Sequence, residues 1–401
     1  MEQTKERALT KSGASALDTF LAVIFAALVY LPASSTFNFI RLGVVAVIFI
    51  FKYYTGEPNK ELNKVAICMA LSPLISGGIV FVMELGTANT ALIVHEIQRM
   101  VFCAMLIVTV QKLELNFRVV YIITVLVLIP NFIIQLLQYS QNGWVFNFIE
   151  NNYVFADEGE FTHLDLAREE YNSGLRCGSI FINPNVYMAI PLYALVVFLH
   201  QDQERKGFVN YALIVCAVIS GLITGSRTAT VAMAIILGIY IFRYANFLGK
   251  IIFVLAAMFV AFRYGSELLT TRAFDIEGGT ESSLTTKINQ YSWFFSSTSV
   301  LYWVTGSLGS SVASTMDSEM GHIYGWYGVF GIYWYIQYYK YIWKHCNEKI
   351  IFYNKPLIYI TVLVAFTASV LLCMPIYPFV ALVLFSDIDT KKELEEEVIT
   401  A

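Results

Sequence analysis

Residues 305–331 read TGSLGSSVASTMDSEMGHIYGWYGVFG and join a polar loop to an apolar segment. The stretch opens with glycines and serines, continues with Asp317, Glu319 and His322, and ends in an aromatic run interrupted by glycines. This order predicts that two acids and a histidine lie where a polar loop meets a membrane helix. The rest of the chain is interpreted as the scaffold that holds this chemistry at the outer membrane surface.

The composition predicts an all-α, polytopic membrane protein. Of the 401 residues, 57% are hydrophobic and 14% are charged, whereas soluble proteins are about one quarter charged. Apolar runs long enough to cross a bilayer as helices recur along the chain, and we predict about twelve of them in a single domain over residues 1–401. Their expected limits are 17–33, 37–53, 63–84, 90–110, 119–138, 184–200, 208–224, 228–243, 247–263, 321–341, 356–373 and 375–386.

The basic residues separate the connecting segments into two classes. Eighteen of the 26 lie at the two ends of the chain or in every second connection. Because positive charge favours the cytoplasmic side, these segments and both termini are predicted to be cytoplasmic. The other connections then face outward, and two of them are long, roughly 139–183 and 265–321.

The eight remaining basic residues are nearly all arginine. Seven are arginine, against four among the eighteen of the cytoplasmic set. Lysine would serve equally well as a topology signal, whereas arginine favours bidentate recognition of phosphate or carboxylate. We interpret the set as recognising an anionic ligand at the outer face; single members can instead snorkel or pair with loop acids. The eight are Arg41, Arg99, Arg168, Arg176, Arg227, Arg263, Arg272 and Lys287.

Two short motifs place arginines beside predicted helix starts. Asn183 is expected to cap a helix that begins at Pro184, and Arg176 precedes that start in a glycine-containing turn. The exposed N–H groups at such a start favour an anion nearby. Thr224–Thr230, TGSRTAT, is a tight outward turn with Arg227 at the start of a span. Each arginine is a candidate phosphate clamp, and the alternative is an ordinary interfacial anchor.

The fourth span contains the polar run His95-Glu96-Ile97-Gln98-Arg99. Its pattern differs from the HExxH zinc motif because Arg99 stands at the last ligand position, so we predict no metal. Polar groups at membrane depth are costly and usually face a cavity or each other. A Glu96–Arg99 pair that holds helices together and a role in substrate binding are both open.

Two further stretches are interpreted from their composition. Ser283–Gly309 has the aromatic spacing of an amphipathic helix lying along the membrane interface, although aromatics could also simply anchor a loop. Asp387-Ile388-Asp389 resembles the DxD of nucleotide-sugar enzymes, but no globular domain is present to hold a nucleotide. We interpret it as a solvated cytoplasmic tail.

Four stretches together resemble the O-antigen polymerase and ligase superfamily, the Wzy-type polymerases in particular. Each is short, so the likeness depends on their order and on the predicted side of the membrane. In the ligase branch a histidine stands eleven residues before a glycine of the second outer loop; here that position is Asp317, which favours a polymerase. The stretches are Arg176-Cys-Gly178 with Asn183-Pro184-Asn185, Gly225-Ser226-Arg227-Thr228, Gly306-Ser-Leu-Gly309, and Asp317-Ser318 followed by Gly328 and Gly331.

The resemblance implies a periplasmic glycosyltransferase with a GT-C-like architecture in the bacterial inner membrane. Its donor and acceptor would both be polyprenyl-pyrophosphate-linked oligosaccharides. Membrane lipid, a chain-length regulator and a flippase are the other expected partners, without nucleic acid, cofactor or metal. The implied pyrophosphate ligands are Arg176 and Arg227, to which the arginine pattern adds Arg99, Arg263 and Arg272 and the motif adds Asn185.

The identity of the base and the reaction class are left open between alternatives. Asp317, Glu319 and His322 are the candidate bases, and Asp317 can instead cap the helix expected near Gly321 or pair with Arg272. A ligase that transfers glycan to lipid A core is the nearest rival activity. A lipid-linked glycan flippase is the rival from another class, but it would place ionisable groups through a central cavity.

Overall fold

The protein is mostly helical, as the composition predicts. The computed structural model describes residues 15–54, 59–154, 164, 176–204, 207–251, 253–255, 258, 283–311, 318–348, 351–367, 370–385 and 387–388. Asp317, Arg168, Arg263 and Arg272, together with residues 252, 256, 257 and 259–263 of the predicted span 247–263, lie outside the described residues.

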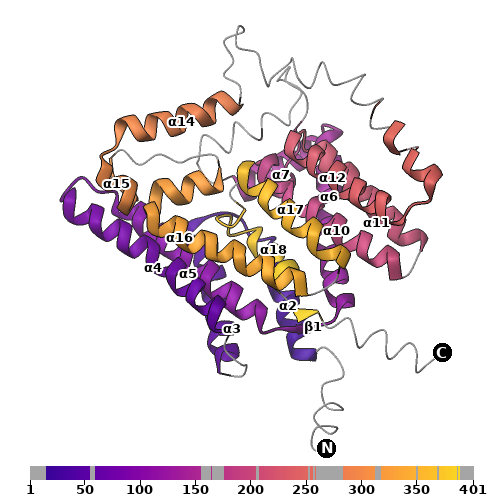
Figure 1. Ribbon diagram of the computed structural model, residues 1–401, viewed down its shortest axis with the longest axis horizontal. Helices are drawn as coiled ribbons and strands as arrows, with labels where there is room; N and C mark the ends of the chain where they lie inside the picture. Colours follow the sequence, from indigo (N-terminus) through magenta and orange to yellow (C-terminus); the bar gives the residue numbers. More distant parts are fainter. Residues whose placement is uncertain are drawn as a thin grey trace, which may run out of the picture.

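The helices of the first half form one side and the back of the bundle in Figure 1. Several begin at an Asn or Ser whose side chain accepts a backbone N–H of the first turn, as Asn59, Asn89, Asn116 and Asn142 do. The elements are α2 (Ala16–Leu28), α3 (Ser35–Tyr53), α4 (Lys60–Met83), α5 (Thr90–Gln111), β1 (Glu114–Leu115), α6 (Phe117–Tyr139) and α7 (Gly143–Tyr153).

The second half completes the bundle and carries the surface helix α14. Asn183 and Ser226 cap the predicted helix starts at Pro184 and Arg227, which are confirmed. The elements are η1 (Ser179–Phe181), α9 (Pro184–Tyr187), α10 (Ala189–Glu204), α11 (Phe208–Ile223), α12 (Arg227–Tyr244), α14 (Ser283–Ser297), α15 (Val300–Thr305), α16 (Glu319–Glu348), α17 (Ile351–Thr367), α18 (Tyr377–Phe385) and β2 (Asp387–Ile388).

Five helices in the described part of the chain are long and apolar enough to cross a membrane. They are α3, α4, α5, α6 and α12. Shorter apolar helices lie over Ala16–Leu28, Pro184–His200, Phe208–Ile223 and Pro356–Ala365. The predicted stretch 283–309 divides into α14, α15 and a non-helical loop that starts at Gly306.

The predicted last span is a half-helix preceded by irregular backbone. α18 has nine residues, every one of them buried, and it occupies the middle of the bundle in Figure 1. Nine residues rise only about 14 Å, less than half of a bilayer core. Irregular backbone at membrane depth is tolerated where protein satisfies its polar groups. The turn over residues 370–376 therefore needs hydrogen-bonding side chains from the surrounding helices.

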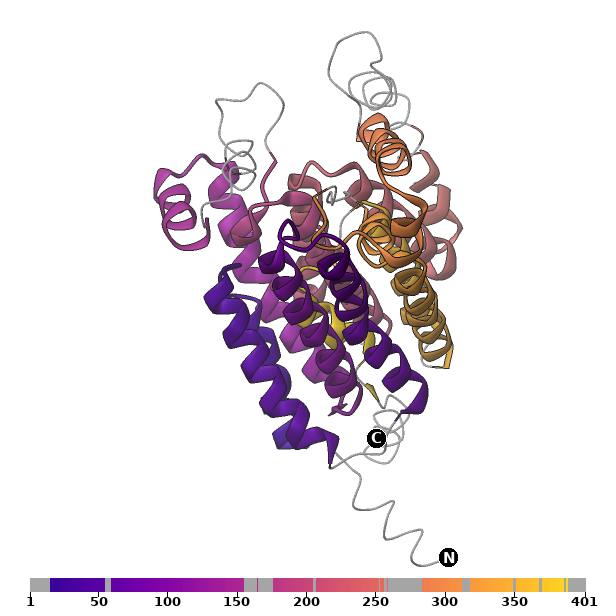
Figure 2. The same cartoon turned by 90° about the vertical axis from the view of Figure 1, so that its left-hand side faces the viewer.

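The basic end of α3 and the basic α5–α6 connection meet at the end of the bundle that carries β1, low in Figures 1 and 2. There Lys52 forms an ion pair with the buried Asp18, and Lys112 donates to the carbonyl oxygen of Tyr53 at 3.1 Å. Asp387 and Ile388 pair in parallel with β1, so these two residues of the segment interpreted as a solvated cytoplasmic tail form a short sheet with the α5–α6 connection. The glycine-rich loops lie at the opposite end, which we call the loop end.

Candidate active site

A buried ion pair on α5 forms the centre of the candidate site. Glu96 is fully buried and pairs with Arg99 one turn further along the helix, as the sequence suggests. The hydroxyl of Tyr327 on α16 donates to the second Glu96 oxygen at 2.6 Å. Nδ1 of His95 lies 3.6 Å from the first oxygen. The carboxylate is thus held by a cation and a hydroxyl from two different helices.

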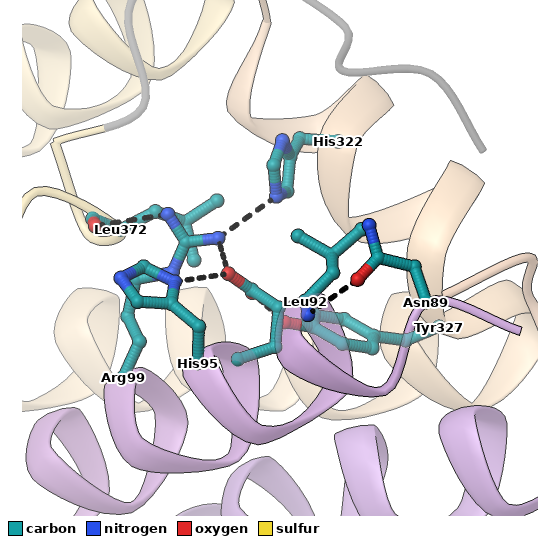
Figure 3. Close-up of polar contacts among 8 residues, drawn as sticks. Asn89, Leu92, His95, Arg99, His322, Tyr327 and Leu372 are labelled. Atoms are coloured by element: carbon teal, nitrogen blue, oxygen red, sulfur yellow. Dashed lines mark hydrogen bonds and ion pairs between the residues drawn. The ribbon is translucent and has the colours of Figure 1, made fainter. Parts of the chain in front are cut away.

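His322 meets this pair from α16 (Figure 3). Its Nε2 lies 3.2 Å from Nη2 of Arg99. Because a guanidinium can only donate, Nε2 is the acceptor and the ring proton is on Nδ1. The His322 ring also contacts Trp326 at a centroid distance of 3.9 Å, and the Arg99 guanidinium lies 5.6 Å from the Trp326 ring centroid. The structure therefore brings Arg99 and His322, two of the predicted residues, into one cluster.

Arg99 also reaches the irregular turn before α18. Its Nη1 donates to the carbonyl oxygen of Leu372 at 3.4 Å. Its buried Nε–H, by contrast, has no acceptor among the described residues. A buried donor without an acceptor costs about 1–3 kcal/mol. The Arg99 guanidinium is therefore held by Glu96, His322 and Leu372, and its Nε–H can donate one further hydrogen bond.

Glu319 contacts the same turn but lies in a separate tyrosine cluster. Its carboxylate is buried and accepts the Leu371 N–H at 2.8 Å and the Tyr335 hydroxyl at 2.9 Å. The Tyr339 hydroxyl lies 3.5 Å away. Cys103 on α5 donates to the Leu371 carbonyl oxygen at 3.2 Å. Glu319 therefore supplies an acceptor that the irregular backbone requires.

The predicted Gly/Ser loop is fixed against a kink in α16. Gly328 interrupts that helix with φ +61°, and a Cβ there would come within 2.2 Å of the Val304 carbonyl oxygen. Ser307 donates from its backbone N–H and its hydroxyl to the Gly325 carbonyl oxygen, at 2.9 and 2.8 Å. Ser76 on α4 donates to the Trp326 carbonyl oxygen at 2.6 Å. The loop and α4 thus each satisfy one of these two carbonyl groups beside the kink.

Glu84 ties the α4–α5 turn to the same loop. It accepts from the Tyr302 hydroxyl and, at 3.0 Å, from the Ser311 N–H. The Asn89 N–H donates to the Gly309 carbonyl oxygen at 2.7 Å. Burial alone would raise the pKa of Glu84, but the hydrogen bonds from Tyr302 and Ser311 outweigh it, so this pKa lies below its ordinary value. The Glu84 carboxylate therefore holds the loop against the α4–α5 turn, and we call these contacts the Glu84 tether.

A second arginine centre joins two motifs that are distant in sequence. Arg176 donates from Nη2 to Oδ1 of Asn185 at 2.8 Å, and the Cys177 N–H donates to the Ile223 carbonyl oxygen at 3.2 Å. Gly225 faces the Arg176 side chain with φ +59°. The two predicted motifs therefore pack together at the loop end.

Three buried amides of α6 hold the turn that follows Arg176. Gln138 and Ser179 exchange hydrogen bonds, and Ser179 also donates to Asn131 at 2.8 Å. Gln135 donates to the carbonyl oxygens of Cys177 and Ser220. These three residues were not predicted from the sequence, although their spacing over two turns within an apolar span was a usable signal.

The remaining predicted arginines differ in environment. Arg227 is exposed at the first position of α12. Arg41 is fully buried and donates to the carbonyl oxygens of Leu28, Leu31 and Pro32, so it satisfies the C-terminal end of α2. The interpretation of Arg41 as part of an anion-binding set is therefore not supported by its contacts. Arg263, Arg272 and Asp317 lie outside the described residues.

Comparison with known proteins gives no relative to guide the assignment. No protein-family model matches the chain, and no curated protein matches it either. The functional argument therefore depends on the residues and contacts above.

Proposed function

We propose that this chain polymerises polyprenyl-pyrophosphate-linked oligosaccharide repeat units into O-antigen or a related surface polysaccharide. The reaction would take place at the periplasmic face of the bacterial inner membrane and would release polyprenyl pyrophosphate. In this proposal the chain is a metal-independent glycosyltransferase with about twelve spans and a GT-C-like architecture. Both termini lie in the cytoplasm, and the loop end of the bundle is periplasmic.

The observation that carries the proposal is the buried Arg99. Charged residues inside membrane helices are rare, and they usually mark a substrate path. Arg99 is braced by Glu96, His322 and the Leu372 carbonyl oxygen, and its Nε–H retains no acceptor among the described residues. An oriented guanidinium of this kind suits a phosphate oxygen, which accepts charge-assisted hydrogen bonds.

The clustering of the resembling motifs at the loop end is the second support. The Arg176 and Arg227 motifs pack together through Gly225. The Gly306–Gly309 motif packs on the α16 kink beside the Arg99 centre. Two outward-facing anchors need not touch each other, so the direct packing of Gly225 against Arg176 supports a shared role for these two motifs.

The proposed reaction is a displacement at the anomeric carbon of the donor. A sugar hydroxyl of the acceptor unit forms a new C–O bond there, while the C–O bond to pyrophosphate breaks. The hydroxyl proton passes to a carboxylate, and the pyrophosphate leaves as an anion whose growing charge is stabilised by arginines held in place beforehand. Arg99, Arg176, Arg227, Arg263 and Arg272 are the proposed donors to that anion, and Asn185 orients Arg176.

Asp317 is our proposed base, while Glu319 and His322 position other groups. Both oxygens of Glu319 already accept hydrogen bonds, one from the Leu371 N–H in the turn before α18 and one from the Tyr335 hydroxyl. Nε2 of His322 already accepts from Arg99. Proton abstraction needs a carboxylate within reach of the substrate hydroxyl. The described contacts of Glu319 and His322 thus favour Asp317, which lies outside the described residues, as the base.

The test uses the purified full-length protein in detergent. Its substrate is the single-repeat lipid-linked glycan that accumulates in a strain lacking this gene. We expect a ladder of lipid-linked oligomers and stoichiometric release of polyprenyl pyrophosphate. Arg99→Lys should retain only part of this activity, because a point charge cannot reproduce the planar guanidinium contacts.

Two outcomes would contradict the proposal. Transfer of the glycan only to added lipid A core would indicate a ligase. Transport into sealed vesicles without any change in glycan length would indicate a flippase. Reporter fusions after Asn152 and Lys206 provide an independent check, since the first should be periplasmic and the second cytoplasmic.

A further inference from the structure

A basic groove lies between α4 and α16 at the end opposite the candidate site. Its volume is about 420 Å³. Three lysines and one glutamate provide its charged groups, and aromatic side chains form much of its wall. The residues that the next steps use are Glu61, Lys64, Tyr333, Lys340 and Lys344.

The charge of the groove is not balanced by its own residues. Glu61 accepts from Lys344 with both oxygens at 3.0 Å, so this acid is already paired. Lys64 and Lys340 are exposed and form no ion pair with any described residue. Two ammonium groups therefore face the same space, although the chain as a whole has a net charge of −4. The ligand that fits is an anion.

Exposed apolar stripes lead away from these lysines on both helices. On α4, Leu71 and Ile75 follow Lys64 at helical spacing and are 42% and 41% exposed. On α16, Ile336 and Tyr333 precede Lys340 at the same spacing and are 47% and 55% exposed. Both stripes run from the lysines toward the loop end of the bundle. A soluble anion would use only the lysines, whereas an amphiphile would use the lysines and the stripes.

We propose that this groove binds an anionic glycerophospholipid, with the phosphate between Lys64 and Lys340 and the acyl chains along α4 and α16. The lysines neutralise the head group, and Tyr333 stands at the boundary where an amphipathic ring is favourable. Basic pockets between membrane helices are a general mode of acidic-lipid recognition. The assignment uses no residue of the proposed catalytic site and is independent of the proposed reaction.

Native mass spectrometry of the detergent-solubilised full chain tests the assignment. The probes are dioleoylphosphatidylglycerol, dioleoylphosphatidylcholine and sodium phosphate. We expect the wild-type protein to retain phosphatidylglycerol, and Lys64→Gln/Lys340→Gln to retain about tenfold less, because each lysine near an anionic head group contributes to binding. The charge-preserving pair Lys64→Arg/Lys340→Arg should retain the lipid, which also shows that the position tolerates substitution.

The matched control is Arg118→Gln/Lys250→Gln. It removes the same charge from the same end of the bundle but outside the groove. Equal loss of phosphatidylglycerol in the control and groove variants would overturn the site, because general positive charge would then explain binding. Equal retention of phosphatidylcholine, or displacement of phosphatidylglycerol by sodium phosphate, would overturn the assignment to an anionic lipid.

Discussion

Gly225 lies directly against the side chain of Arg176, and a Cβ at position 225 would stand 2.9 Å from Cγ of that arginine. Real Cβ atoms do not approach another heavy atom so closely, so any larger residue must displace the arginine. The distance couples two motifs that are almost fifty residues apart in the sequence. It gives the glycine a role in placing a guanidinium as well as in forming a turn.

We predict that Gly225→Ala impairs polymer formation by about 10²-fold, because small misplacements of a binding group have effects of this size. The alanine also adopts positive φ, which costs about 1–2 kcal/mol by itself. Gly86→Ala is the matched control: φ at Gly86 is +92°, but a Cβ there meets nothing within 4 Å. Glycan ladders from membranes of each strain measure the effect, and equal ladders from the two variants would contradict it.

Removal of Arg99 should destabilise the protein as well as inactivate it. Arg99→Gln leaves the fully buried Glu96 without its cation, which costs about 3–5 kcal/mol. Glu96→Gln/Arg99→Gln removes both charges, and we expect it to recover most of the thermal stability while remaining inactive. Unfolding midpoints in detergent and the extension assay measure the two effects separately. Recovery of activity in the double variant would exclude Arg99 from substrate binding.

Asp317→Asn should impair catalysis but not stability, whereas Glu319→Gln should lower the stability of the protein. Asparagine caps a helix about as well as aspartate but cannot accept a proton, so Asp317→Asn should insert normally and yield only single-repeat product. Glu319→Gln leaves one acceptor oxygen where the carboxylate has two, so either the Leu371 N–H or the Tyr335 hydroxyl loses its acceptor, and we expect a lower unfolding midpoint.

The pair of variants separates the base from the positioning residue. Membrane levels, unfolding midpoints and glycan ladders are measured for both. A full ladder from Asp317→Asn would remove Asp317 as the base. An unchanged midpoint for Glu319→Gln would contradict the structural role of that carboxylate.

The Glu84 tether should make stability depend on pH in the acid range. Its pKa is depressed in the folded protein, so its contribution is present above the unfolded-state pKa and is lost as pH falls through the folded-state pKa. The difference in unfolding midpoint between wild type and Glu84→Gln should therefore shrink as pH falls below about 4.3, the ordinary pKa of a glutamate. Glu61→Gln is the control, since an exposed pair with Lys344 contributes little. A difference that does not change with pH would contradict this prediction.

Features that depend on neighbouring residues could be predicted from the sequence, whereas contacts between distant segments of the chain could not. Caps at Asn183 and Ser226 were predictable, because a cap and its helix are adjacent in the chain. The Glu96–Arg99 pair was predictable from helical spacing. The contact of Arg176 with Gly225 was not, because it depends on how α11 and the segment before α9 pack.

Arg41 shows why the arginine pattern overestimated the binding set. Its sequence context is that of an arginine near an outer membrane end, but its guanidinium donates to three carbonyl groups at and just after the end of α2. A carbonyl group in a bilayer needs a donor as much as a phosphate does. Nothing in the residue type separates these two uses, so only the packing of α2 against α3 decides between them.

The central position of α18 has a consequence for biosynthesis. Arg99 and Leu372 are 273 residues apart, so the polar groups of α5 obtain these partners only when almost the whole chain has left the ribosome. At about 5–20 residues per second, this interval lasts on the order of tens of seconds. During that time the charged pair on α5 has no central segment to cover it. We therefore expect a factor that shields polar transmembrane helices to bind this protein before its synthesis ends.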